Sequence, residues 1–364
     1  MISPKNYFPI IKTKDAELRG MCSLAQETKN DIVPLFELTR SRITPKLPDG
    51  PVAKRLAKIA TDYGTTPLSL DLTSFTDLQN SEIRGYYDAK DGFQKWTQFI
   101  YEQTDTFPDI YPVLLISDEG ISSEDEYCQR HRPEVASLLD SCGKLIYRIS
   151  GDYEALQFDL ENLFDSSNQP IVVLDMEYIP REKGEVYAQK ACQSLEIIDQ
   201  HGVQHVILTG SSFPKDPTEN GDQGYGENKL EEVLMYNHCK RQFSELIYGD
   251  YASIYPLPNE RAGGRGWVPR IDFPSVSEDL IVYYRDKKKT NEGSYKNAYI
   301  RVAQKVVRDR RFLDLKTCIG QQNWGIQQIL LAAEGYPPGL NPSFWISVRI
   351  NLHVTLRQLK LRES

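Results

Sequence analysis

Short runs of apolar, β-branched and aromatic residues recur along the chain, and each is followed by a stretch with helical periodicity. Eight such runs occupy residues 7–11, 32–38, 67–73, 111–117, 144–150, 170–178, 203–211 and 248–256. The helical stretches between them occupy residues 15–26, 51–63, 92–103, 123–142, 152–164, 184–202 and 228–247. A chain that alternates strands and helices in this way is typical of a fold built around a parallel sheet.

Eight strands within about 250 residues match the number and spacing of a (β/α)₈ barrel. A doubly wound open sheet is the alternative, but no Gly-rich phosphate-binding turn follows the first strand. The GGRG motif at 263–266 does not join a strand to a helix, and we interpret it as a turn. We therefore predict an α/β fold in which residues 1–256 form a TIM-like (β/α)₈ barrel.

The strand–helix rhythm ends after residue 256, and the charge changes sign there. Residues 1–260 carry 25 Lys and Arg against 42 Asp and Glu, whereas residues 261–364 carry 18 against 9. A strand-like segment at 280–285 precedes helical stretches at 294–312, 325–335 and 342–361. We predict that residues 257–364 form a basic, mainly helical C-terminal extension packed on the barrel. Its charge is balanced either by the acidic barrel or by a polyanionic partner.

The composition, 40% apolar and 26% charged, is typical of a globular protein. The N-terminus has no apolar segment followed by a cleavage site, and no run of about 18 apolar residues occurs anywhere. The six cysteines are far apart and form no C-x-x-C pair, which indicates reduced thiols rather than disulfides or a zinc site. We expect a cytoplasmic protein without a membrane segment.

Catalytic residues of a (β/α)₈ barrel lie at the C-terminal ends of the strands, which meet at one mouth. The charged residues predicted there, and hence the candidate catalytic residues, are Lys12, Glu37, Asp71, Arg148, Asp175, Glu177 and Asp250. Asp175 and Glu177 lie two positions apart in one predicted strand, so regular alternation would place both carboxylates on the same face.

Two arrangements of these mouth residues are open. Glu37, Asp71 and Asp175 could hold Mg²⁺ or Mn²⁺, which prefer oxygen ligands, while basic residues neutralise a phosphate. Alternatively, the acids and bases pair with each other and close the barrel. The first arrangement predicts a phosphate-bearing ligand, a nucleotide or nucleic acid, and metal-dependent phosphohydrolase or nuclease activity. The sequence leaves open whether the chain is an enzyme.

The basic C-terminal part supplies a second candidate site. The residues that could follow a phosphate backbone, with a tyrosine for stacking, are Arg270, Tyr284, Arg285, Lys287, Lys288, Lys289, Arg308, Arg310 and Arg311. A solvated charged surface is the alternative, because Asp286, Glu292 and Asp309 lie among these residues. The alternative function is therefore a non-catalytic scaffold that binds nucleic acid or a protein partner, or that forms a homo-oligomer.

Short motifs occur over nearly the whole chain: YFPIIKTKDAEL at 7–18, IVPLFEL at 32–38, LSLDLT at 68–73, VVLD at 172–175, YGDYASIYP at 248–256, PRIDFP at 269–274 and NLHVT at 351–355. Together they resemble the beta-protein family, which we associate with a bacteriophage T4 protein. The resemblance implies a barrel protein of phages and bacterial defence loci without an agreed reaction, and hence a role in phage–host conflict. Members tend to carry two adjacent histidines near the C-terminus, where this sequence has Leu352 and His353.

Overall fold

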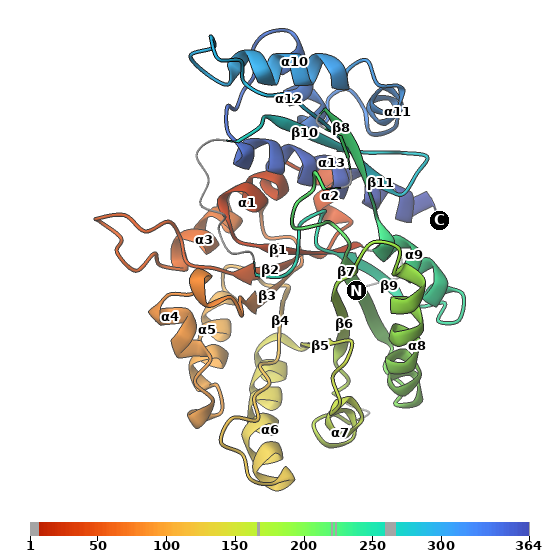
Figure 1. The fold of residues 1–364 in the computed structure, drawn as a ribbon. Coiled ribbons are helices and arrows are strands. Elements are labelled where there is room, and N and C mark those ends of the chain that lie inside the picture. The colour runs from red at the N-terminus through yellow and green to blue at the C-terminus, as the bar shows by residue number, and fades with distance from the viewer. Residues whose placement is uncertain (1–6, 166–167, 220, 223, 259–266, 364) are drawn as a thin grey trace.

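The computed structural model describes residues 7–165, 168–219, 221–222, 224–258 and 267–363 (Figure 1). The GGRG motif therefore lies outside the described residues. The centre of the fold is a parallel sheet with the strand order β4-β3-β2-β1-β9-β7-β6-β5. Its strands are β1 (Tyr7–Lys12), β2 (Leu35–Leu38), β3 (Leu68–Leu72), β4 (Ile110–Pro112), β5 (Ile146–Ser150), β6 (Ile171–Tyr178), β7 (His205–Ser211) and β9 (Ile247–Asp250).

The sheet closes into a barrel between β4 and β5. Val113, directly after β4, forms a parallel bridge with Ile146 at the start of β5. The backbone N–H of Leu114 also donates to the carbonyl oxygen of Ile146 at 2.8 Å. The predicted TIM-like (β/α)₈ barrel is therefore confirmed.

Helices cover the outside of the barrel (Figure 1). They are α1 (Asp15–Cys22), α2 (Gln26–Asn30), α3 (Ala53–Lys58), α4 (Ser81–Tyr86), α5 (Gln94–Gln103), α6 (Glu124–Cys142), α7 (Leu156–Asn162), α8 (Gly184–Gln200) and α9 (Glu231–Lys240). Helical turns also occur at η1 (Ile59–Tyr63), η2 (Thr76–Leu78) and η3 (Ala89–Asp91). None of the helices in the part of the chain that the structure describes combines the length and hydrophobicity needed to cross a bilayer.

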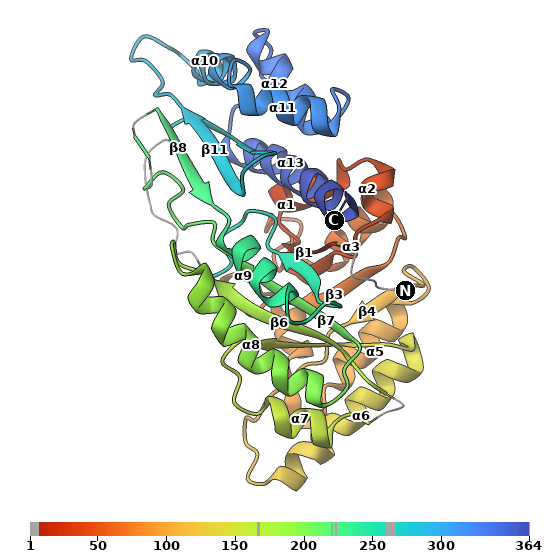
Figure 2. The same ribbon diagram turned by 90° about the vertical axis from the view of Figure 1, so that its right-hand side faces the viewer.

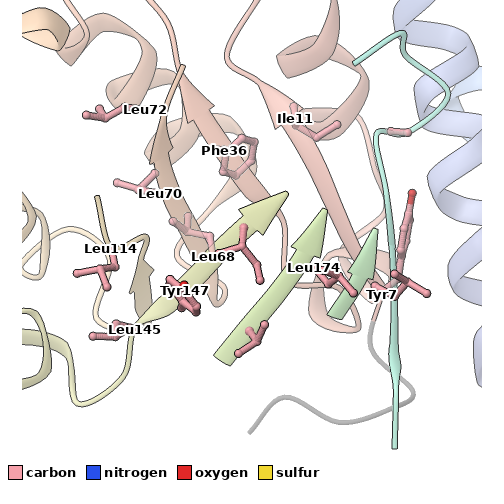
Figure 3. Packing of buried hydrophobic residues seen from close by; sticks show 14 of the residues in the cluster. Tyr7, Ile11, Phe36, Leu68, Leu70, Leu72, Leu114, Leu145, Tyr147 and Leu174 are labelled. Carbon is pink, nitrogen blue, oxygen red and sulfur yellow. The ribbon is translucent and has the colours of Figure 1, made fainter. Parts of the chain in front are cut away.

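Side chains of the strands alternate between two apolar layers. Phe8 and Ile10 of β1 point into the barrel, where they pack with residues such as Val173 of β6. Ile11 of β1 and Leu174 of β6 belong to the outer layer, between strands and helices (Figure 3). The interior is thus a packed core, as expected for a barrel of eight strands.

A second, antiparallel sheet has the order β10-β11-β8. Its strands are β8 (Tyr225–Lys229), β10 (Arg270–Pro274) and β11 (Leu280–Arg285). Because β8 lies between β7 and α9 in the chain, the segment 1–256 contributes a strand to the C-terminal sheet. The helix predicted at 228–247 is wrong at both ends, since its first residues belong to β8 and its last residue begins β9.

Helices dominate the C-terminal part, as predicted. They are α10 (Lys296–Val306), α11 (Arg310–Ile319), α12 (Trp324–Ala333) and α13 (Pro342–Glu363). Residues 294–312 therefore hold one complete helix and the start of a second, instead of the single helix predicted. The first three helices lie on the side of the second sheet away from the barrel (Figures 1 and 2).

The long helix α13 lies between the two parts of the molecule (Figure 2). Ile350 and Val354 pack into the core around the barrel, whereas Val348 and Leu352 pack into the core of the second sheet. A Cβ atom added to Gly20 of α1 would lie 2.9 Å from the Ile350 side chain. Glycine at this position therefore permits the close approach of α1 and α13.

Candidate functional site

Charged side chains point inward at the C-terminal ends of the barrel strands. Lys12 ends β1 and is in register with Glu37 of β2, which is in register with Asp71 of β3. Arg148 of β5 and Asp175 of β6 also face inward. The residues two positions before them, Ile146 and Val173, face the same way and belong to the apolar core one layer below. The structure brings these five predicted residues to one mouth.

Arg148 occupies the centre of the mouth. Its Nη1 atom lies 2.8 Å from Oε1 of Glu37 and 2.6 Å from Oδ2 of Asp71. Its Nη2 atom lies 2.7 Å from Oδ2 of Asp175 and donates to the hydroxyl oxygen of Tyr251 at 2.8 Å. One guanidinium group thus joins carboxylates from three strands. A lysine could not replace it, because an ammonium group lacks the planar fork of donors.

Lys12 is the second cation of the mouth and is only 4% exposed. Its Nζ atom lies 2.9 Å from Oε2 of Glu37 and 3.3 Å from the carbonyl oxygen of Pro256. The same atom lies 4.4 Å from the centre of the Phe75 ring. Both cations of the mouth are therefore already paired with carboxylates.

Burial and ion pairing shift the pKa values of Glu37, Asp71 and Arg148. Burial alone would raise the pKa of Glu37, but Lys12 and Arg148 outweigh it and lower that pKa to about 2. Burial raises the pKa of Asp71, and the nearby negative charge of Glu37 raises it as well. The attraction to Arg148 lowers this pKa but does not compensate for the other two effects. Burial favours the neutral form of Arg148, yet Tyr251 and the carboxylates raise its pKa further above the ordinary value. Glu37 and Arg148 are consequently charged at every ordinary pH.

The carboxylates of Asp175 and Glu177 do not share a face. The pairing of β6 with β7 shifts after Asp175, and Glu177 has a φ of 51°. This left-handed conformation is uncommon outside glycine, and it exposes Glu177 while Asp175 stays 3% exposed. The backbone N–H of Glu177 donates to Oδ1 of Asp175 at 2.9 Å. Burial and the charge of Asp175 raise the pKa of Glu177. The expected shared face fails because the strand bulges there.

The predicted metal ligands Glu37, Asp71 and Asp175 all face the guanidinium group of Arg148. Within the described ranges, no group of three or more His, Cys, Asp or Glu side chains is arranged to hold a metal ion. The mouth in this structure corresponds to the arrangement in which acids and bases pair with each other. A metal-binding role for the three carboxylates stays a prediction.

Asp250 does not join the other predicted residues at the mouth. Its neighbour Tyr251 points inward, whereas the buried Asp250 carboxylate points outward to α13. Nε2 of His353 lies 2.7 Å from its Oδ2 atom, the hydroxyl group of Tyr248 donates to the same oxygen, and the hydroxyl group of Tyr7 donates to Oδ1. Burial would raise the pKa of Asp250, but His353 and its hydrogen bonds lower it. Asp250 therefore fastens α13 to the barrel wall.

The predicted nucleic-acid-binding residues fall into two groups. The first group surrounds the start of α11. There Nη1 of Arg311 lies 2.6 Å from Oε1 of Glu227, and Nη2 lies 2.9 Å from Oδ2 of Asp309. The hydroxyl group of Tyr284 also donates to Asp309, at 2.9 Å. Tyr284 and Arg311 thus hold α11 against the sheet, while the other members of this group, Arg308 and Arg310, are exposed.

The second group surrounds the turn after β11. Arg270 and Arg285 are paired in register across β10 and β11, and Nε of Arg270 lies 2.7 Å from Oδ1 of Asp272. The turn that follows β11 contains three exposed basic side chains, Lys287, Lys288 and Lys289. We call these three residues the lysine turn.

Tyr251, which the sequence places beside Asp250 at the end of the last predicted barrel strand, joins the mouth network. Two residues near the lysine turn were missed from the sequence. Trp267 and Tyr295 stack with ring centres 4.2 Å apart and planes inclined by 21°. They are 28 positions apart in the sequence. Spacing along the chain therefore gave no signal for their contact.

The fold and its mouth define a (β/α)₈-barrel protein with an internally paired charge cluster and a basic C-terminal part. The family model described as "Beta protein" matches residues 7–358, almost the whole chain. The chain therefore belongs to the beta protein family. It is 26% identical to "Protein beta" of Enterobacteria phage P4, over 99% of this chain and 94% of that protein. The association of the family with phage T4 is wrong, because the relative found is from phage P4.

Solved structures share the architecture only loosely. A trimodular GH5_4 subfamily endoglucanase aligns with a TM-score of 0.41 at 12% identity, over 68% of this chain and 55% of that chain. This chain thus spans about half of that enzyme's length. The catalytic domain of a mannanase from Streptomyces sp. SirexAA-E aligns with a TM-score of 0.39 at 14% identity, over 66% and 73% of the two chains.

Proposed function

We propose that this beta protein is a nucleic-acid-binding component of phage–host conflict in which the barrel is a scaffold and the C-terminal part makes the contact. Its excess of basic residues, 18 Lys and Arg against 9 Asp and Glu over residues 261–364, supports an anionic partner. The similarity to a phage P4 protein supports a role during phage infection, when phage and host nucleic acids are both present.

The observation that carries the proposal is that the acidic residues near the lysine turn form ion pairs with Arg301. Nε of Arg301 lies 2.9 Å from Oδ2 of Asp286, and its other nitrogens pair with the Glu292 carboxylate. Nη2 of Arg301 also donates to the carbonyl oxygen of Lys287 at 3.1 Å. Both acids that would dilute the positive charge are thus paired with one arginine from α10.

The lysine turn is held in shape by the same contacts. The backbone N–H of Lys289 donates to Oε2 of Glu292 at 2.8 Å, while Arg301 binds the other side of the turn. A backbone fixed in this way keeps three consecutive exposed lysines in one turn, with less backbone entropy to lose on binding. Phosphate contacts of this kind supply affinity without reading the sequence of the nucleic acid.

The barrel mouth supports binding of a free phosphate less well. Both of its cations are paired, and a phosphate would have to displace a carboxylate from Lys12 or Arg148. Such an exchange leaves a buried carboxylate without its partner, which costs several kcal/mol.

The salt dependence of binding tests the proposal. Affinity for a labelled 20-nucleotide DNA is measured from low to moderate salt for the wild type and for a variant with Lys287, Lys288 and Lys289 changed to alanine. Each lost phosphate contact reduces the slope of log K against log salt by about 0.7 for single strands, so about 2 in total. A control changes the exposed barrel lysines Lys54, Lys90 and Lys183 to alanine. Equal slopes for both variants would refute the proposal.

A second function is proposed for the mouth because its backbone is strained. Glu177, Ala252 and Ser253 follow the inward-facing residues of β6 and β9, and their φ values are 51°, 47° and 62°. Non-glycine residues in this region often mark functional sites. In this second proposal Arg148 would bind a ligand phosphate, and the carboxylates it releases would hold Mg²⁺ or Mn²⁺ for hydrolysis.

The second function is tested by incubating the wild type and Asp175→Asn with DNA, RNA and nucleoside triphosphates in Mg²⁺ or Mn²⁺. Products formed by the wild type and lost in the folded variant would support a catalytic mouth. An absence of products from the wild type with every substrate would refute hydrolysis of these substrates and leave the scaffold function.

A further inference from the structure

Two aromatic rings lie beside the lysine turn. Trp267, shortly before β10, stacks on Tyr295 at the start of α10, with ring centres 4.2 Å apart. Nζ of Lys288 lies 5.3 Å from the centre of the Tyr295 ring. The stack and the lysine turn therefore form one continuous surface, which we call the stacking platform.

The indole side chain of the stack is partly exposed. Trp267 is 39% exposed, which makes it one of the large apolar side chains that the fold does not bury. Tyr295 is half-buried and supports the indole ring from below, with Lys288 close to its own ring. A ring that is held in place and still exposed loses little entropy when a planar partner stacks on it.

Positive charges outnumber negative ones among the described residues named at the stacking platform, where Lys287, Lys288, Lys289, Lys296 and Arg301 stand against Asp286 and Glu292. Arg301 pairs with Asp286 and Glu292, and the exposed Lys296 directly follows Tyr295. Cationic groups beside an exposed aromatic face are the combination that binds single-stranded nucleic acid, since the backbone follows the charges while bases stack on the ring.

We propose that the stacking platform binds single-stranded DNA or RNA, with a base on the exposed face of Trp267 and the adjoining phosphates at Lys287, Lys288 and Lys289. This inference rests on the proposed function and names its substrate class. A duplex keeps its bases stacked inside the helix and offers no free base to Trp267. An acidic peptide would satisfy the lysines but has no planar base to stack.

The experiment compares probes that differ only in their bases. Affinity is measured by fluorescence anisotropy for a labelled 20-nucleotide oligothymidine, an abasic oligonucleotide of the same length and a 20-base-pair duplex. The wild type should bind oligothymidine about tenfold more tightly than the abasic strand, because one stacked base contributes on that order. Trp267→Leu should remove this difference and keep the binding of the abasic strand. A thermal melt establishes that each variant is folded.

A matched control changes an exposed aromatic residue away from the lysine turn. Tyr336 is 72% exposed in the loop after α12, and Tyr336→Leu should bind all three probes as the wild type does. Tyr295→Leu, which removes the support of the indole ring, should weaken the preference for bases without changing the abasic affinity.

The outcomes separate the inference from the proposed function. Equal binding of oligothymidine and the abasic strand by the wild type would overturn stacking and leave phosphate binding by the lysine turn intact. Tighter binding of the duplex, or equally effective competition by a 20-residue polyglutamate, would overturn the choice of single strands. No binding of any probe at low salt would overturn both proposals.

Discussion

Nε2 of His353, on the last helix of the chain, lies 2.7 Å from Oδ2 of Asp250, at the end of the last barrel strand. Both side chains are almost completely buried. The hydroxyl groups of Tyr7 and Tyr248 donate to the same carboxylate. Residues from the first and last barrel strands and from α13 therefore meet at one buried charge, and the C-terminal part is attached to the barrel there.

Loss of the Asp250 charge should loosen this attachment. Asp250→Asn removes the charge and leaves a single acceptor oxygen for His353 and the two tyrosines, and we expect a loss of about 3 kcal/mol in the free energy of unfolding. Urea denaturation measures it. Asp279→Asn serves as the control, because Asp279 is 44% exposed and its pairs with Arg357 and Lys360 should contribute less than about 1 kcal/mol. Equal losses for the two variants would contradict a special role of Asp250.

The difference in the free energy of unfolding between the wild type and Asp250→Asn should also depend on pH. The pKa of Asp250 is lowered in the folded protein, so its stabilising charge is complete above the ordinary Asp pKa. The stabilisation is lost as the pH falls through the lowered value. The two proteins should therefore converge in stability in acid, and a constant difference down to pH 2 would argue against the assignment.

Removal of the central guanidinium should destabilise the barrel. Arg148→Met leaves Glu37, Asp71 and Asp175 buried without their shared cation, and we expect a loss of about 3–5 kcal/mol. Arg148→Lys should restore only part of the stability, because an ammonium group cannot bridge three carboxylates. The control is Arg181→Met, since Arg181 is 58% exposed beside Glu182 and its replacement should cost less than about 0.5 kcal/mol. Wild-type stability of Arg148→Met in chemical denaturation would show that the network stabilises nothing.

Stability should decrease between about pH 4.5 and pH 7 because of Glu232. Burial and the nearby charge of Asp250 raise the pKa of Glu232 from 4.5 to about 7. The folded protein then keeps a proton that the unfolded chain has released, so unfolding becomes easier as the pH rises through this range, by about 3 kcal/mol. Glu232→Gln should abolish the decrease in melting temperature, whereas Glu231→Gln should retain it. An unchanged pH profile in Glu232→Gln would exclude this carboxyl as the cause.

Nucleic-acid binding should depend on Arg301 although Arg301 need not touch the ligand. Arg301→Leu releases Asp286 and Glu292, which can then pair with the lysine turn and compete with phosphates. Lys305→Leu removes the same charge from an exposed position on the same helix. We expect Arg301→Leu to bind oligothymidine about fivefold more weakly than Lys305→Leu, corresponding to roughly 1 kcal/mol. Identical affinities would show that the carboxylates do not influence the lysine turn.

The barrel and the five residues at its mouth could be predicted because they depend on local patterns. A run such as IVVLD at 171–175 indicates a buried strand by its composition, and its last residue faces the same side as the apolar Val173 below it. In a parallel barrel all strands end at one mouth, so Lys12, Glu37 and Arg148 meet there whatever the details of packing.

The segments that the patterns did not predict take their structure from distant partners. β8, with the sequence YGENK, has no apolar alternation and is a strand because β11 pairs with it. Glu177 departs from alternation because β6 bulges against β7.

The order of residues along the chain was enough to specify eight strands, their direction and the charges at their ends, since each depends on neighbours two to four positions away. Only the folded structure decided that Arg148 joins three of those charges, that Asp250 turns outward to His353, and that Arg301 pairs with the acids beside the lysine turn. Hydrogen bonds and ion pairs depend on distances of about 3 Å between side chains. Such distances between residues far apart in the chain are fixed only when the whole barrel and α13 pack together.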